Sequence, residues 1–135
     1  MTNIVVVVLN YKTPDLAVNA AQSAAAAMAH FGGVILLVDN ASPDDSLDRM
    51  QKGVDAAAWP DHLTVQVLQS GRNGGFGAGN NFGIRAGLAI CPDAEFVYIL
   101  NPDAHVAETS ISALVDHLNA HPEAAIAGSW ISGED

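Results

Sequence analysis

Ile4-Val5-Val6-Val7-Val8-Leu9 is an unbroken run of apolar, mostly β-branched residues near the start of the chain. Such a run is typical of a strand that is covered on both faces of a sheet. Thr13-Pro14 follows it and predicts an N-cap and a first helical residue for the alanine-rich segment up to His30. The pattern is a strand followed by a helix, which is the repeating unit of α/β proteins.

The same unit recurs along the rest of the chain. Val34–Val38 predicts a second strand, and Ser42-Pro43 repeats the cap signal before a helix expected to end near Trp59-Pro60. Further strands are expected at 63–68, 96–100 and 124–127, and further helices at 76–90 and 110–119. We therefore expect one α/β domain over residues 1–135, with a doubly wound, mainly parallel sheet and helices on both faces.

Composition narrows the class of ligand. The chain has 135 residues, with 5 basic and 15 acidic side chains and a formal net charge of -10, so nucleic acid is not an expected partner. A small phosphate ligand stays open, because a divalent cation can lie between carboxylates and phosphates. Cys91 is the only cysteine, and neither a signal peptide nor a membrane-spanning apolar run is recognisable, so the expected compartment is the cytoplasm.

Polar residues fall where the predicted strands end, and ligands of open parallel sheets bind beyond that edge. Asn10 follows the first strand and Asp39 follows the second. The Asp39 carboxylate could accept hydrogen bonds from a base or a ribose. Asp39-Asn40-Ala41-Ser42 could equally be a turn, since Asp and Asn bond well to their own backbone.

The stretch from Gly71 to Asn81 is unusually rich in glycine, which gives up chain entropy and side-chain packing. One interpretation is a cradle for a base or diphosphate, with free N–H groups at the start of a helix and Arg72 beside them. The alternative is a tight turn that leads into a helix packed closely on the sheet.

Asn101-Pro102-Asp103 comes directly after the strand at 96–100. An extended chain would point Asn101, Asp103 and His105 to one side. Asp103 would suit Mg²⁺ or Mn²⁺, with Asn101 as a neutral partner. A simple Asn-Pro-Asp turn is the alternative interpretation. His117 and His121 have the i, i+4 spacing of a zinc pair but lack the intervening Glu, which favours a solvated helix face.

Four motifs in order resemble those of family 2 glycosyltransferases of the GT-A fold. Their residues are most similar to those of rhamnosyltransferase-like members. They are Val-Leu-Asn-Tyr-Lys at 8–12, Val-Asp-Asn-Ala-Ser at 38–42, Asn73 to Asn81 followed by Gly83, and Leu-Asn-Pro-Asp-Ala at 100–104. The resemblance runs from Asn3 to about Trp130. It implies a Rossmann-like donor-binding half with a dTDP- or UDP-linked sugar, a divalent cation and inverting transfer to an acceptor hydroxyl.

The resemblance also implies roles for single residues. Asp39 matches an aspartate that binds the base or ribose, Arg72 and Asn73 fall where the nucleobase is flanked, and Asn81 closes the glycine-rich motif. Asp103 matches the final acid of the Asp-x-Asp motif, whereas Asn101 departs from the usual first Asp and should weaken cation binding without nucleotide. The predicted donor-binding and metal residues are Asn10, Asp39, Arg72, Asn73, Gly75, Asn81, Asn101 and, for the metal, Asp103.

The resemblance covers the donor half only, so no catalytic base is assigned to this chain. Glu134-Asp135 resembles the family's later acidic pair but directly follows the last predicted strand. The family implies a role in cell-wall or polysaccharide synthesis, a glycan or lipid-linked acceptor, and peripheral membrane association of a full-length enzyme. Two other functions stay open: a non-catalytic nucleotide-binding or interaction module, and an NAD-binding domain. In the second, the glycines should follow the first strand, not the third.

Overall fold

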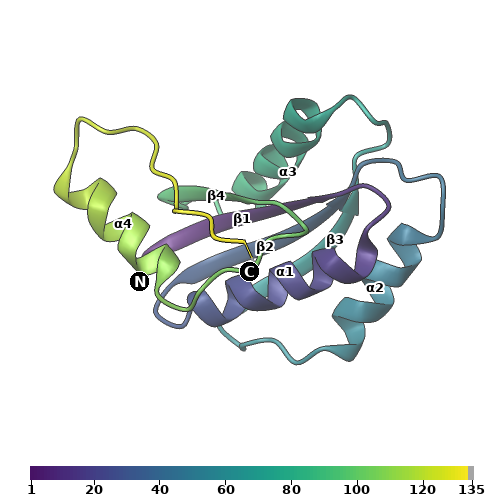
Figure 1. Ribbon diagram of the computed structural model, residues 1–135, viewed down its shortest axis with the longest axis horizontal. Coiled ribbons are helices and arrows are strands. Elements are labelled where there is room, and N and C mark those ends of the chain that lie inside the picture. Colours follow the sequence, from purple (N-terminus) through teal and green to yellow (C-terminus); the bar gives the residue numbers. More distant parts are fainter. Residues whose placement is uncertain (134–135) are drawn as a thin grey trace.

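Four parallel strands form the centre of the protein, whose computed structural model describes residues 1–133. The strands are β1 (Asn3–Asn10), β2 (Gly32–Asp39), β3 (Leu63–Gln69) and β4 (Phe96–Leu100). Their order in the sheet is β3-β2-β1-β4 (Figure 1). The chain therefore moves outward from β1 to β3 and then returns to place β4 on the other side of β1. The direction of winding reverses between β1 and β4.

Helices cover both faces of this sheet. They are α1 (Pro14–Ala27), α2 (Ser46–Ala56), α3 (Phe76–Ile90) and α4 (Ser110–Ala120). The helices α1, α2 and α4 lie on one face, and α3 lies alone on the other (Figure 1). The arrangement confirms the predicted doubly wound α/β class.

The two central strands supply a core on each face of the sheet. Side chains of β1 alternate between the faces, so that Val6 and Val8 pack with α1 whereas Val5 and Val7 pack with α3. All four are fully buried. Burying one such side chain stabilises the fold by about 1.5–3 kcal/mol, which explains why β1 and β2 read as continuous apolar runs.

Three glycines bring α3 close to the sheet. Gly79, Gly83 and Gly87 recur every four residues and lie on the helix face that meets β1. A Cβ atom at Gly83 would lie only 2.6 Å from Cγ1 of Val7. For these positions the close-packing interpretation of the glycine-rich segment holds.

The predicted strand at Ala124–Ala127 is wrong. Residues 121–133 contain no strand, and the side chain of Ile126 is 89% exposed. Three of those four residues are alanine, which gives little side-chain area to pack on a pleated surface. Within residues 1–133 the sheet therefore ends at β4, whose Val97 and Ile99 remain partly exposed on the α3 face.

One predicted cap bond and one predicted helix start differ from the structure. Thr13 does precede α1, but its hydroxyl makes no cap bond and instead donates to Oδ1 of Asn10 at 3.0 Å. Ser42-Pro43 does not begin the next helix, which starts at Ser46. Ser42 does not cap the helix, because both its backbone N–H and its hydroxyl donate to Asp39. Hydrogen bonds to Asn10 and Asp39, each three residues earlier in the chain, thus occupy the hydroxyls that the sequence predicts as caps.

No helix among residues 1–133 is both long enough and apolar enough to cross a membrane.

Candidate functional site

The loops after β1 and β4 border a pocket at the point where the winding of the sheet reverses. We call it the switch-point pocket. Its volume is about 480 Å³, and residues from the carboxyl-terminal ends of all four strands and from the start of α3 line it: Leu9, Tyr11, Thr13, Asn40, Asn73, Phe76, Asn101, Pro102 and Asp103. The pocket lies where open parallel sheets bind ligands, since strand ends and helix starts leave polar groups free there.

Beneath this pocket, Asn10 and Asp39 join the ends of β1 and β2. Both side chains are fully buried. Nδ2 of Asn10 donates to Oδ1 of Asp39 at 3.1 Å, and Oδ1 of Asn10 accepts from the backbone N–H of Thr13 at 3.0 Å. Asp39 also accepts from the backbone N–H of Ser42 at 2.9 Å and from its hydroxyl at 2.7 Å. The predicted turn at residues 39–42 is therefore present, and the Asp39 carboxylate is engaged within the protein.

The same network supports two strained turns. Lys12 and Ala41 have φ angles of 63° and 58°, in the left-handed region that side-chain-bearing residues rarely adopt. A backbone conformation of this kind costs about 1–3 kcal/mol per residue, and it persists only where the surrounding structure holds it. Here the Ser42 hydroxyl oxygen accepts from the N–H of Lys12 at 3.0 Å, which ties the two turns to each other.

Asn40 holds the glycine-rich loop against the pocket. Its side chain is 4% exposed, and its Nδ2 donates to Oδ1 of Asn73 at 3.1 Å and to the carbonyl of Gly75 at 3.4 Å. Its Oδ1 accepts from the hydroxyl of Ser70 at 2.9 Å. One buried amide thereby fixes three points of the loop that follows β3.

Gly75 lies at the N-cap of α3 with φ of 93°, which explains why glycine is needed there. Its backbone N–H donates to Oδ1 of Asn73 at 3.0 Å. This N–H is therefore not free for a ligand, although the cradle interpretation expects free N–H groups at the start of the helix. The Nδ2 group of Asn73 makes no hydrogen bond among the described residues and borders the pocket.

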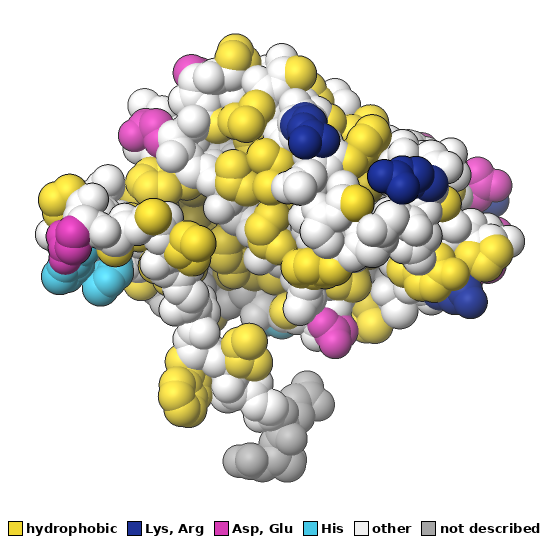
Figure 2. Space-filling model, turned by 90° about the horizontal axis from the view of Figure 1, so that it is seen from above, with side chains coloured by type: hydrophobic (Ala, Val, Ile, Leu, Met, Phe, Trp, Pro, Cys, Tyr) yellow, Lys and Arg dark blue, Asp and Glu magenta, His cyan; other side chains and the backbone are white. Residues whose placement is uncertain are grey.

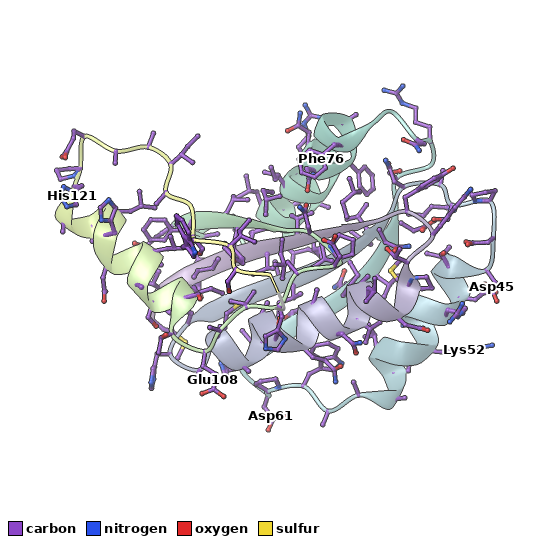
Figure 3. All side chains as sticks on the ribbon, viewed as in Figure 1. Asp45, Lys52, Asp61, Phe76, Glu108 and His121 are labelled. Carbon is purple, nitrogen blue, oxygen red and sulfur yellow. The ribbon has the colours of Figure 1, made fainter. Side chains whose placement is uncertain are left out.

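Phe76 begins α3 (Figure 3) with 61% of its surface exposed. It lines the switch-point pocket together with Tyr11. Lys12 places its ammonium 5.2 Å from the centre of the Tyr11 ring. Tyr11 and Asn40 lie in the motifs at 8–12 and 38–42 but were not among the predicted site residues, and Phe76 was predicted only as the start of a helix. An exposed aromatic directly after the Gly-Gly pair is the only signal that could have identified Phe76.

Apart from Gly75 at the N-cap of α3, the predicted site residues separate into three groups. Asn73, Asn101 and Asp103 line the switch-point pocket, and Asn10 and Asp39 lie buried beside it. Arg72 and Asn81 line a second hollow of about 360 Å³, between α3 and the loop after β3. We call this second feature the α3 hollow.

Among residues 1–133, Asp103 is the only carboxylate that lines the switch-point pocket. No group of three or more His, Cys, Asp or Glu side chains that could hold a metal ion occurs among residues 1–133. His117 and His121 do stack, with ring centres 4.4 Å apart, but they lie on α4 and its end, outside the lining of the pocket. Glu134 and Asp135 lie outside the described residues.

Comparison with solved structures shows where this fold occurs. Crystal structures of TarS 1–349 from S. aureus match with a TM-score of 0.63 at 20% identity, covering 90% of this chain and 33% of that one. The mannosyltransferase PcManGT from Pyrobaculum calidifontis, in complex with GDP-Man and Mn²⁺, matches with a TM-score of 0.67 at 18% identity, covering 85% and 32%. The chain therefore spans about a third of the length of these structures.

A TarS structure in complex with UDP-GlcNAc matches with a TM-score of 0.63 at 20% identity, covering 90% of this chain and 32% of that one. A comparison with curated protein sequences found no match. The family model described as glycosyl transferase family 2 matches residues 4–135. Because that match spans nearly the whole sequence and the fold agrees, the chain belongs to glycosyl transferase family 2.

Proposed function

We propose that the switch-point pocket binds the nucleoside-diphosphate part of a sugar donor, and that the chain is the donor-binding part of an inverting glycosyltransferase. One observation carries the proposal. Asn101 and Asp103 after β4, and Asn73 after β3, come from distant parts of the sequence and line one pocket where the sheet reverses its winding. TarS and PcManGT were solved with UDP-GlcNAc and GDP-Man, and they share the fold. The residues of the four motifs further favour a rhamnosyltransferase-like enzyme with a dTDP- or UDP-linked donor.

A divalent cation fits this pocket only together with the diphosphate. Asp103 offers one carboxylate and Asn101 one neutral amide oxygen, which is too little charge for a site that holds metal by itself. Mg²⁺ commonly keeps several waters and is bound through one or two carboxylates plus substrate phosphates. When bound, such a cation would neutralise the charge that builds on the leaving diphosphate.

Three of the other predicted residues support the pocket structurally and do not contact the donor in this proposal. Asn10 and Asp39 are fully buried and engaged with each other, so we assign them to holding the ends of β1 and β2 in register under the donor. Gly75 permits the turn that presents Asn73, whose Nδ2 remains available as a donor to a base or phosphate. Arg72 and Asn81 line the α3 hollow and lie outside this proposed contact set.

Transfer itself needs groups that we assign to no residue here. A general base must deprotonate the acceptor hydroxyl, and in the described part of the chain no carboxylate other than Asp103 lines the pocket. We propose a glycan or lipid-linked acceptor, a role in cell-wall or polysaccharide synthesis, a cytoplasmic location and peripheral contact of the whole enzyme with the membrane. These parts of the proposal rest on the family alone.

Thermal unfolding tests donor binding. A ligand that binds only the folded state at a hundred times its Kd stabilises it by about 2.7 kcal/mol. UDP, dTDP or GDP with Mn²⁺ should therefore raise the Tm by several degrees, and Asp103→Asn should remove the metal-dependent part of that rise. Asp61→Asn is the matched control, since Asp61 is exposed on the far side of the sheet from Phe76 (Figure 3).

If UDP, dTDP and GDP all leave the Tm unchanged in the presence of Mn²⁺, the proposal for this chain is contradicted. A non-catalytic module is then favoured. An equal loss in Asp103→Asn and Asp61→Asn would show that overall charge, and not the pocket, determines the effect. Stabilisation by NADH in place of these nucleotides would restore the dinucleotide-binding alternative.

A further inference from the structure

Asn73 and Gly74 form the only Asn-Gly pair in the chain. In such a pair the backbone nitrogen of the glycine can attack the side-chain carbonyl carbon of the asparagine, because glycine has no Cβ to shield that nitrogen and its backbone rotates easily. In a folded protein the reaction depends on three groups, which are the attacking nitrogen, the carbonyl oxygen and the leaving amide nitrogen. The hydrogen bonds of this loop define the state of each.

The attacking nitrogen belongs to Gly74, and it is free. Its N–H donates to no group among residues 1–133, and both Asn73 and Gly74 are exposed to solvent. Most backbone N–H groups are bonded in helices or sheets and must break that bond before they can react. Gly74 lies in the loop before α3, so this cost is absent.

The side-chain carbonyl oxygen of Asn73 accepts two hydrogen bonds. One comes from Nδ2 of Asn40 at 3.1 Å and the other from the backbone N–H of Gly75 at 3.0 Å. Attack on the carbonyl carbon moves negative charge onto this oxygen, and two donors already in place stabilise that charge as an oxyanion hole does. Asn40 is itself held by Ser70 at 2.9 Å, so the first donor is fixed before the reaction begins.

The leaving group and the local charge also favour the reaction. Nδ2 of Asn73 makes no hydrogen bond in the described part of the chain. A Cβ atom built at Gly74 would lie 3.4 Å from Cζ of Arg72, so a positive charge adjoins the attacking residue and favours loss of its N–H proton. Figure 2, which looks onto the α3 face, shows basic side chains among hydrophobic and uncharged ones, with acidic side chains toward the periphery.

We propose that Asn73 is a site of spontaneous deamidation and that its modification weakens donor binding in the switch-point pocket, the second part resting on the function proposed above. The Gly74 nitrogen forms a bond to Cγ of Asn73, the bond from Cγ to Nδ2 breaks, and Nδ2 leaves as ammonia with the proton of Gly74. Water then opens the cyclic imide at either of its two carbonyls. The product at position 73 is aspartate or isoaspartate.

Either product changes the chemistry of the pocket. Nδ2 of Asn73 is the donor that we assign to a base or phosphate, whereas an ionised carboxylate only accepts hydrogen bonds. The new negative charge lines the same pocket as Asp103 and repels a diphosphate. Isoaspartate also lengthens the backbone by one carbon directly before the turn at Gly75, where φ is 93°.

Incubation of the whole chain in warm, mildly alkaline buffer, followed by peptide mass spectrometry, tests the reaction. The peptide that contains Asn73 should gain one mass unit, and the rate should rise with pH because hydroxide removes the Gly74 proton. A synthetic peptide of residues 70–78 is the reference, and the folded chain should react at least as fast. Asn119 is the internal control, because it is exposed on α4 but is followed by alanine within the helix.

Gly74→Ala should slow the reaction by at least about tenfold, because the added methyl group shields the attacking nitrogen. A Cβ atom at this position would lie 2.9 Å from that of Ala78, so the loop of the variant can shift. The comparison with the peptide uses the original sequence and is independent of that shift. Reaction of Asn73 that is much slower in the folded chain than in the peptide would overturn the modification site.

Asn73→Asp, which makes one product directly, tests the effect on the pocket. It should bind UDP with Mn²⁺ about tenfold more weakly than the original chain, as expected for the loss of a hydrogen bond to a charged group. Equal affinity would overturn the effect on the donor. Absence of UDP binding in the original chain would overturn this effect together with the proposed function, whereas the reaction at Asn73 is measured by mass in either case.

Discussion

Asn10 and Asp39, 29 residues apart in sequence, share a buried hydrogen bond of 3.1 Å that joins the ends of β1 and β2. The register of the sheet places them opposite each other as the last pair of the β1–β2 ladder. Both side chains also hold the first turn of the chain that follows them, through Thr13 and Ser42. The polar edge of the sheet is thus built before any ligand binds.

Replacing Asp39 by Ala should destabilise the fold. The change leaves a buried Asn10 amide and two Ser42 donors without their acceptor, and the expected loss is about 3 kcal/mol in the free energy of unfolding. Urea unfolding measures this loss. Asp61→Ala, at an exposed position, should change the same free energy by less than about 0.5 kcal/mol. A loss below about 1 kcal/mol for Asp39→Ala would show that the buried network adds little to stability.

Alanine should have opposite effects at two glycines of α3. Gly83→Ala places a Cβ atom 2.6 Å from Val7 and 3.1 Å from Val38, and the resulting strain of about 1–3 kcal/mol should exceed the gain in helix propensity. Gly77→Ala meets no atom within 4 Å and should stabilise the helix by up to about 1 kcal/mol. Paired denaturation curves check both. The packing explanation is wrong when the two variants shift stability in the same direction.

Cys91 should react slowly with thiol reagents. Burial, followed by the hydrogen bond to Asp93 and the negative charge of that residue, raises the pKa of the Cys91 thiol above its ordinary value of 9.0. Less thiolate is then present at mildly alkaline pH, so alkylation should be slower than for an exposed cysteine peptide. Asp93→Asn removes the charge and should speed the reaction.

The raised thiol pKa also sets the sign of a pH effect on stability. Because folding disfavours the Cys91 thiolate, this group's contribution is fully present below pH 9.0 and is lost as the pH rises through the folded-state pKa. Cys91→Ser should flatten that part of the stability profile. A profile that is identical in the two proteins would contradict the assignment.

A second carboxylate should let the pocket hold a cation without nucleotide. Asn101→Asp places an acid two residues before Asp103, at the edge of the same pocket, and should strengthen Mn²⁺ binding roughly tenfold in the absence of nucleotide. Isothermal titration with Mn²⁺ measures the change. The double variant Asn101→Asp, Asp103→Asn restores the original number of carboxylates and should bind Mn²⁺ no better than the original protein. Equal Mn²⁺ affinity in the single variant and the original would remove Asn101 from the metal site.

Local sequence patterns predicted each helix and strand found among residues 1–133, and also a strand at 124–127 that the structure does not contain. Helix 76–90 and strand 96–100 agree with the structure to the residue, since apolar periodicity and flanking glycine or proline are local signals. The glycine-rich motif, the ends of the strands and the Asn101-Pro102-Asp103 turn were also visible in the sequence, and they were sufficient to predict the family. The local pattern located the start of α1 after Thr13 but not the bond that the Thr13 hydroxyl makes to Asn10. It failed at Ser42, whose hydroxyl donates to Asp39 while the next helix begins only at Ser46.

Only the tertiary structure decided which polar residues meet. The strand order β3-β2-β1-β4 returns β4 to the side of β1, and this return brings Asn101 and Asp103 to the pocket that Asn73 borders. It also directs Arg72 to a different hollow from its neighbour Asn73, and buries Asp39 where an exposed ligand contact was one of two interpretations. Sequence patterns record which residues end a strand, because that depends on local periodicity. The contacts of those residues depend on register and strand order, which arise only when the whole sheet packs.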